Sequence, residues 1–234
     1  MKKGYYNENT IAKFAEALKS AKNQIDEMIG NGELVKVKFS NGNSKIGEIP
    51  SVSTLPFLTC PGRCAGTCAS ACYAAKLANM RENVRNAYAW NTALALYHSD
   101  IYHAQVKAFC SMQRYFRYHV SGDVINSEYF ANMVDNARSN PHCEILAFTK
   151  RFEVVNAWIN ENGKIPANLH ILFSGWSNMI PENPYKLPET TVYEKETDFN
   201  DSWLTCGGNC AECVCRGLGC WKATTGDVIA FKKH

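Results

Sequence analysis

Cysteine spacing is the feature that most constrains what this chain folds into. Residues 59–74 read TCPGRCAGTCASACYA, and a second cysteine-rich run, CGGNCAECVCRGLGCW, lies near the C-terminus. The first group comprises Cys60, Cys64, Cys68 and Cys72, and the second comprises Cys206, Cys210, Cys213, Cys215 and Cys220. Nine of the eleven cysteines therefore fall in two short windows, which is the clustering that thiolate ligation of a metal ion or cluster requires.

The regular interval of the first group looks helical, but one helix does not suit a shared site. On a continuous α-helix the step from Cys60 to Cys72 would span about 18 Å, too far for one cluster. Pro61, Gly62 and Gly66 supply the breaks that a tighter path needs. We therefore expect a loop from Cys60 to about Cys68 that runs into a helix near Cys72.

The spacing favours iron–sulfur over zinc. Structural zinc sites usually combine two C-x2-C pairs, or cysteine with histidine, whereas only Cys210 and Cys213 form such a pair and neither window contains histidine. We expect one or two iron–sulfur clusters, of the [4Fe–4S] type, with zinc as the alternative. Five thiols exceed the four that a closed cluster takes, so one C-terminal cysteine is spare or serves elsewhere. The isolated Cys110 and Cys143 are expected to pack in the core.

Bulk properties narrow the setting. The 234-residue chain carries a formal charge of +3, too small by itself to indicate a nucleic-acid partner. Its apolar runs fall short of the roughly 18 residues of a membrane span, and its N-terminus does not resemble a secretory signal. These features predict a cytoplasmic protein without membrane association, in a compartment that keeps thiols free for metals.

Helical and strand patterns alternate along the second half of the chain. We expect helices over 9–29, 74–113 (as two helices), 127–140 and 152–162, and strands over 34–39, 115–123, 143–150, 169–176, 190–194 and 227–231. This order predicts an α/β fold with a parallel sheet, closed into a barrel or left open. Three segments make up one compact unit: an N-terminal helix and hairpin (1–58), an α/β core with the first cysteine loop (59–195) and a cysteine-rich extension (196–234).

Polar residues end three of the predicted strands, where parallel sheets build their sites. Arg117, His119 and Ser121 alternate along one strand, so we expect them to share a face and to converge with Asp123, the nearest sequence partner for a buried arginine. The predicted catalytic residues are Arg117, His119, Asp123 and Lys150, and the predicted cofactor-binding residues are Ser121, Gly122 and Ser174. The simpler alternatives are a helix cap for Asp123, a core imidazole for His119 and a solvated rim for Lys150 and Arg151.

Several short motifs together resemble a known family. LPFLTCPGRC, CASACYA, RYHVSGDVINSEYF, AFTKR, LFSGW and the terminal cysteine run resemble, in that order, the phage gene-product-88-like family, over most of the chain after about Lys45. More distantly, the cysteine loop followed by βαβ units is similar to radical S-adenosylmethionine barrel enzymes. That likeness implies a partial (β/α) barrel, possible binding of S-adenosylmethionine near Ser121-Gly122-Asp123, and a C-terminal group that acts as an auxiliary-cluster extension.

The likeness to radical enzymes has one departure. Those enzymes use three thiolates in C-x3-C-x2-C, and here the third position, counted from Cys60, is Thr67. Three ligating thiols, such as Cys60, Cys68 and Cys72, leave an iron open for chemistry, whereas four close the cluster. The first hypothesis is accordingly a radical-enzyme-like iron–sulfur protein that acts on an unidentified substrate. The alternative is a non-catalytic iron–sulfur or zinc module that binds nucleic acid or a host protein through Arg81, Arg85, Lys150 and Arg151.

Overall fold

A parallel sheet forms the centre of the molecule. The computed structural model describes residues 6–176 and 178–232, with Arg63 described by its backbone alone. The strands are β1 (Ser51–Val52), β2 (Tyr115–Tyr118), β3 (Glu144–Thr149), β4 (Leu169–Ser174), β5 (Glu189–Tyr193), β6 (Leu204–Thr205) and β7 (Val228–Lys232). They pair in the order β1-β2-β3-β4-β5-β7-β6, and every pairing is parallel. The predicted α/β class with a parallel sheet is confirmed, and strands from all three predicted segments join this one sheet.

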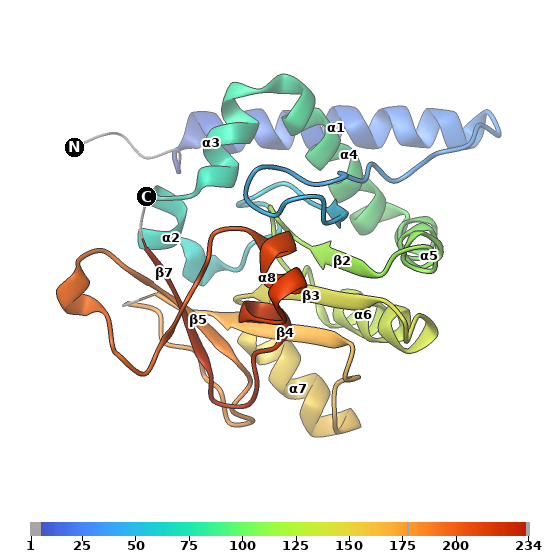
Figure 1. Ribbon diagram of the computed structural model, residues 1–234. Coiled ribbons are helices and arrows are strands. Elements are labelled where there is room, and N and C mark those ends of the chain that lie inside the picture. The colour runs from blue at the N-terminus through green and yellow to red at the C-terminus, as the bar shows by residue number, and fades with distance from the viewer. Residues whose placement is uncertain (1–5, 177, 233–234) are drawn as a thin grey trace.

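Eight α-helices are present in the described part of the chain, and they lie on both sides of the sheet. They are α1 (Glu8–Gly30), α2 (Thr67–Ser70), α3 (Tyr73–Met80), α4 (Glu82–Tyr97), α5 (Ser99–Cys110), α6 (Ser127–Ser139), α7 (Phe152–Asn162) and α8 (Cys210–Arg216). Figure 1 shows α5, α6 and α7 on one side of the sheet and α8 on the other. No helix within the described ranges combines the length and apolarity needed to cross a membrane.

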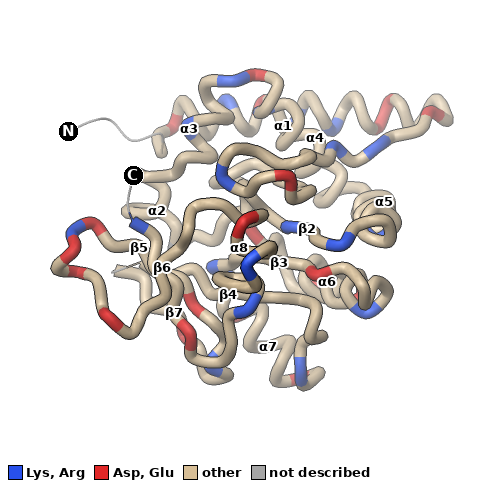
Figure 2. Tube along the Cα trace, viewed as in Figure 1, with Lys and Arg blue, Asp and Glu red and all other residues tan. Residues whose placement is uncertain are grey.

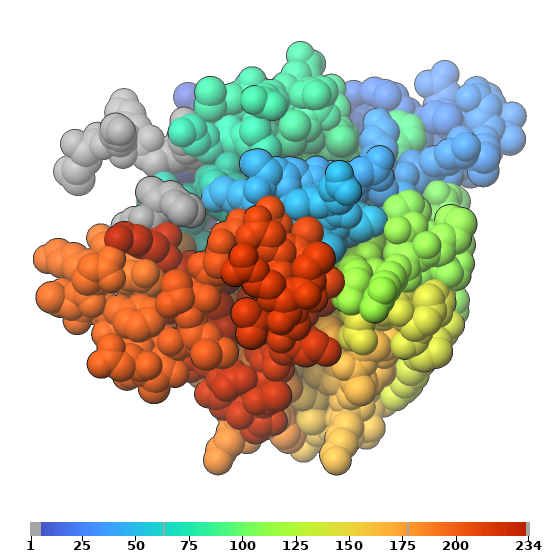
Figure 3. Space-filling model, in the orientation of Figure 1, coloured from blue at the N-terminus to red at the C-terminus, as the bar shows by residue number. Residues whose placement is uncertain are grey.

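The two faces of the sheet enter two separate hydrophobic cores. Phe116, Ile145 and Ile171 point toward the helices and belong to the larger core. Leu146 and Leu172, one residue further along their strands, point the other way and pack with Cys220, Trp221 and Ile229. This second face is therefore covered by the C-terminal cysteine segment (residues 206–221), which lies against residues near 45 in Figure 3.

The prediction of a strand over 34–39 is wrong, because the structure has no strand there. Val35 and Val37 are nevertheless buried, as the alternating pattern requires. Its backbone is bound by side chains of two helices instead of by a strand. Gln105 accepts from Val37 N at 2.8 Å and donates to Val35 O at 2.7 Å, while Asn91 accepts from Lys38 N at 2.9 Å and donates to Lys38 O at 2.8 Å. Because these side chains satisfy the backbone groups, the segment needs no strand neighbour.

Two other boundaries differ from the sequence prediction. Residues 74–113 form three helices rather than two, with breaks at Arg81 and His98. Strand β2 ends at Tyr118, short of the predicted 123, because His119 adopts a left-handed conformation with φ of 56°. Strands β1 and β6 were not predicted, since two residues are too few for a periodic pattern.

Candidate metal centres

The first cysteine group folds as a series of short turns after β1. Cys64 ends a 3-10 turn (Gly62–Cys64), Cys68 lies in α2, and the Cys72 side chain caps α3 by accepting from Ala75 N at 3.4 Å. The expected loop, broken at Pro61, Gly62 and Gly66, is confirmed. The Cys64 thiol is hydrogen-bonded to both Cys60 and Cys68, and Cys72 lies within electrostatic range of Cys60 and Cys68. The four thiols therefore converge.

Charge and hydrogen bonding make these thiols unequal. The hydrogen bond from Cys64 lowers the pKa of Cys68 to about 6, with help from the Lys150 ammonium group and an indole donor, Trp176, and against the effect of burial. The hydrogen bonds to Cys60 and Cys68 raise the pKa of Cys64 well above its usual value, and burial raises the pKa of Cys72 to about 11. Of Cys64, Cys68 and Cys72, only Cys68 has a pKa lowered from its ordinary value, and a lowered thiol pKa favours the thiolate form that binds metals.

The Ser121-Gly122-Asp123 motif holds the segment that leads into Cys60. Ser121 Oγ donates to Thr54 O at 2.9 Å, and Asp123 N donates to Thr59 Oγ1 at 3.3 Å. Gly122 has φ of 87°, and a Cβ atom there would lie 1.9 Å from Thr54 Oγ1, so only glycine fits. The motif predicted to bind a cofactor thus also anchors the first cysteine loop.

Asp123, Lys150 and Ser174 come together beside the first cysteine group, at the carboxyl ends of β3 and β4. Asp123 is buried and accepts from Thr149 Oγ1 at 2.6 Å and from Lys150 N at 2.9 Å, while Lys150 Nζ donates to Ser174 Oγ at 2.8 Å. Burial raises the pKa of Asp123. Burial also acts to lower the pKa of Lys150, but the negative charges of Cys68 and Asp123 outweigh this effect, so the pKa of Lys150 is raised. A lysine ammonium therefore faces the thiols.

The second cysteine group converges around α8 on the opposite face of the sheet from the helices. Cys206, Cys210, Cys213 and Cys220 all lie within electrostatic range of one another, whereas Cys215 is exposed. Gly208 N donates to Cys206 Sγ at 3.4 Å, and a Cβ atom on Gly219 would lie 3.2 Å from Cys213 Sγ. Four of the five thiols thus lie near one another, and Cys215 is the exposed one. Among the described residues, no group of three or more His, Cys, Asp or Glu side chains is placed so that it could hold a metal ion.

Arg117 does not pair with Asp123, and that prediction is wrong. Arg117 lies on the face of β2 that meets the C-terminal cysteine segment, so its Nη1 donates to Cys210 Sγ at 3.3 Å and its guanidinium stacks 4.7 Å from the Phe148 ring centroid. Its Nε is buried and has no hydrogen-bond partner among the described residues. Asp123 lies beyond the end of β2, and its carboxylate accepts hydrogen bonds from Thr149 and Lys150 at the end of β3.

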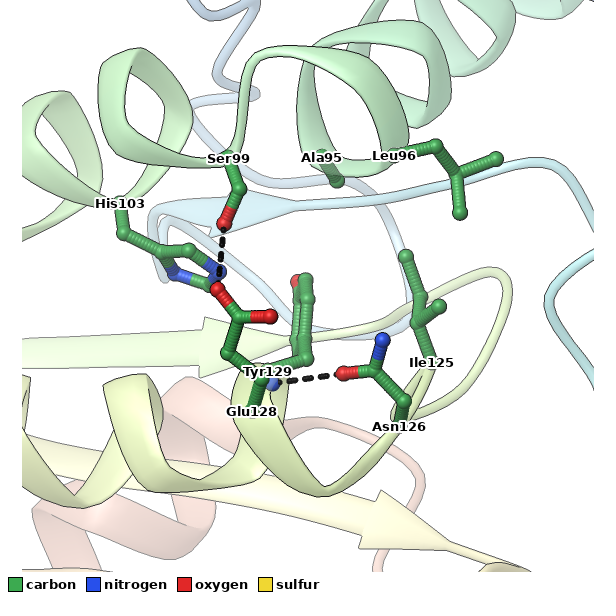
Figure 4. A pocket seen from close by; sticks show the side chains of 8 residues that line it. All are labelled: Ala95, Leu96, Ser99, His103, Ile125, Asn126, Glu128 and Tyr129. Atoms are coloured by element: carbon green, nitrogen blue, oxygen red, sulfur yellow. Dashed lines mark hydrogen bonds between the residues drawn. The ribbon is translucent and has the colours of Figure 1, made fainter.

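His119 also departs from its expected face. Its left-handed backbone turns the side chain toward the helices, where Nε2 contacts Tyr129 Oη at 2.9 Å and burial lowers the pKa to about 3. Tyr129 in turn borders a small cavity, of about 70 Å³, between α4, α5 and the start of α6 (Figure 4). His119 therefore does not share a face with Arg117. Cys110 and Cys143 contact each other in the larger core, as predicted.

Sequence reasoning assigned no role to Trp176 and Thr59. The Trp176 side chain lowers the pKa of Cys68, and the loop after β4 contacts α2, where Asn178 Nδ2 donates to Thr67 Oγ1 at 2.8 Å. A usable signal existed, because Trp176 lies two residues beyond the end of β4 and so at the carboxyl edge of the sheet.

Comparison with known proteins identifies the family of the chain. A protein-family model described as Gene product 88 matches residues 10–221, a span that contains both cysteine groups. Neither the curated proteins nor the solved structures gave a match. The first of the two resemblances is thereby confirmed, and nothing in these comparisons supports the second, to radical S-adenosylmethionine enzymes. Because the family model matches most of the chain, the chain belongs to the Gene product 88 family.

Proposed function

We propose that this protein is a phage-encoded iron–sulfur protein that carries out redox or radical chemistry on a substrate held at the carboxyl edge of its sheet. Three of the four thiols Cys60, Cys64, Cys68 and Cys72 would hold the first centre, and Cys206, Cys210, Cys213 and Cys220 would hold the second. The observation that carries the proposal is the convergence of the first four thiols beside Lys150. Reducing conditions in the host cytoplasm would keep these thiols available.

The surroundings of the sulfurs suit a cluster. Each set of thiols is next to one cation from the sheet, Lys150 for the first and Arg117 for the second. Backbone and side-chain donors also reach the sulfurs of Cys206 and Cys210. Donors and positive charges of this kind are the means by which proteins tune iron–sulfur centres, which supply one-electron transfer when bound.

Contacts within the first group favour a three-thiolate arrangement. Cys64 is hydrogen-bonded to Cys60 and Cys68, whereas the Cys72 sulfur is engaged by a backbone N–H at the start of α3. We propose that Cys60, Cys64 and Cys68 are the ligands and that the partial barrel is of the radical-enzyme type. S-adenosylmethionine would then lie near Ser121, Gly122 and Ser174, with Asp123 and Lys150 fixing the edge of that site.

Anaerobic purification followed by iron, sulfide and zinc analysis tests the proposal. We expect a brown protein with iron and sulfide, whose reduced-state electron paramagnetic resonance spectrum changes when S-adenosylmethionine is added. An unchanged spectrum would contradict the radical-enzyme reading alone. A colourless protein with stoichiometric zinc would contradict the iron–sulfur proposal itself.

The alternative of a non-catalytic binding module has less support. Three of its four proposed cations are engaged: Lys150 with Ser174, Arg85 with Ala78 O at 3.2 Å, and Arg151 with Val124 O at 3.1 Å. They therefore do not form a free basic surface for nucleic acid.

A further inference from the structure

A cavity lies where strands β4 and β5 part. The two strands pair only at Phe173 with Glu189 and Ser174 with Thr190, while β5 continues to Tyr193 along β7. Beyond Ser174 the chain turns away from the sheet. The space left between β5, the loop after β4 and the loop after β5 is about 590 Å³, a size typical of small-molecule sites.

Trp176 connects this cavity to the first cysteine group. Its ring lines the cavity, and its side chain lowers the pKa of Cys68, so the indole lies close to that thiol. The loop that carries it is also tied to α2 by the contact between Asn178 and Thr67 at 2.8 Å. A molecule in the cavity would therefore be separated from Cys68 by one aromatic ring.

The lining of the cavity is aromatic and acidic. Tyr193 and Trp203 supply aromatic surface besides Trp176, and Phe199 packs between them at 5.2 Å from the Tyr193 ring centroid and 5.9 Å from that of Trp203. The charged residues that line it are Glu189, Glu194, Lys195 and Asp198, which leave an excess of negative charge. Figure 2 shows acidic residues gathered on the loop that follows β5, at the left of the view. Aromatic faces and carboxylates together attract organic cations.

We propose that this cavity binds a small organic cation, an amine or quaternary ammonium group on an apolar body, as the substrate class of the first centre. The assignment to a substrate rests on the proposed function, whereas the assignment of the cavity to a cation rests on its lining alone. Asp198 and Trp203 are the specificity-determining residues, because a carboxylate and an aromatic ring line the same space.

Titration calorimetry on the anaerobically purified protein tests the proposal with three probes that share a phenyl ring and differ in charge: benzyltrimethylammonium, benzyl alcohol and benzoate. We expect the cation to bind at least about tenfold more tightly than the alcohol, and benzoate more weakly still. Asp198→Asn should weaken cation binding about tenfold, because it removes the charge and keeps an oxygen that can accept from Lys195 N. Asp201→Asn, a nearby acid outside the cavity, should leave binding unchanged.

Equal affinity for the cation and the alcohol, or equal effects of the two asparagine variants, would overturn the cation site. Addition of the cation should also perturb the electron paramagnetic resonance spectrum of the centre, and an unperturbed spectrum would overturn its role as a substrate site. An iron-free protein that binds the cation with the same dependence on Asp198 would support the cavity and contradict the proposed function, so the two failures are distinguishable.

Discussion

Arg117 Nη1 donates a hydrogen bond to Cys210 Sγ at 3.3 Å, across 93 positions of sequence. The contact joins β2 to the C-terminal cysteine segment, which covers the second core. Arg117 Nε is buried and has no hydrogen-bond partner among the described residues, so the contact from Nη1 to Cys210 helps to compensate for the burial of the guanidinium.

Replacing Arg117 should weaken the second centre selectively. Arg117→Met removes the donor to Cys210 and keeps an apolar stem against Phe148. Loss of such an outer contact typically costs about 10- to 100-fold in metal affinity. We expect faster loss of metal to a chelator, measured against Arg114→Met, an exposed arginine on the same stretch. Equal rates in the two variants would contradict the role of Arg117.

The C-terminal thiols should divide into four ligands and one bystander. Cys213→Ser should remove the metal of the second centre, because Cys213 lies among Cys206, Cys210 and Cys220. Cys215→Ser should retain the full metal content, since Cys215 is exposed. Metal analysis of both variants checks this, and a loss of metal in Cys215→Ser would show that the spare thiol has been misassigned.

Gly122→Ala should destabilise the protein more than a glycine substitution with similar backbone geometry. Gly122 (φ 87°) and Gly163 (φ 83°) both have a positive φ, so alanine is strained at either position. Only at Gly122 would the new Cβ also meet another atom, Thr54 Oγ1 at 1.9 Å. We expect an additional loss of about 1–3 kcal/mol in the free energy of unfolding relative to Gly163→Ala. Thr54→Ala in the same chain should restore part of it, and no recovery would argue against this clash.

The parts of this fold that local pattern governs were predictable. Alternating strands and helices from β2 to α7 follow from periodicity, and the path of the first cysteine loop follows from Pro61, Gly62 and Gly66. The misses depend on distant contacts. The partner of Arg117 lies 93 residues away, and segment 34–39 is bound by the side chains of Asn91 and Gln105. The cavity beside Trp176 arises because β4 and β5 part, which no single stretch of sequence records.

His119 should make the protein less stable in mild acid. Burial lowers its pKa to about 3, whereas an unfolded chain holds histidine near its ordinary value of roughly 6.5. Between these values the unfolded chain binds a proton that the folded protein does not, so the free energy of unfolding falls as pH decreases, by about 2 kcal/mol from pH 7 to pH 5.

His119→Gln, which keeps a polar group for Tyr129, should lose this part of the pH dependence. His103, whose pKa burial also lowers, to about 4, is present in both proteins, so the difference between their urea unfolding curves at the two pH values reports His119 together with its coupling to His103. Parallel curves with the same loss of stability in both proteins would show that His119 is not held neutral by the fold.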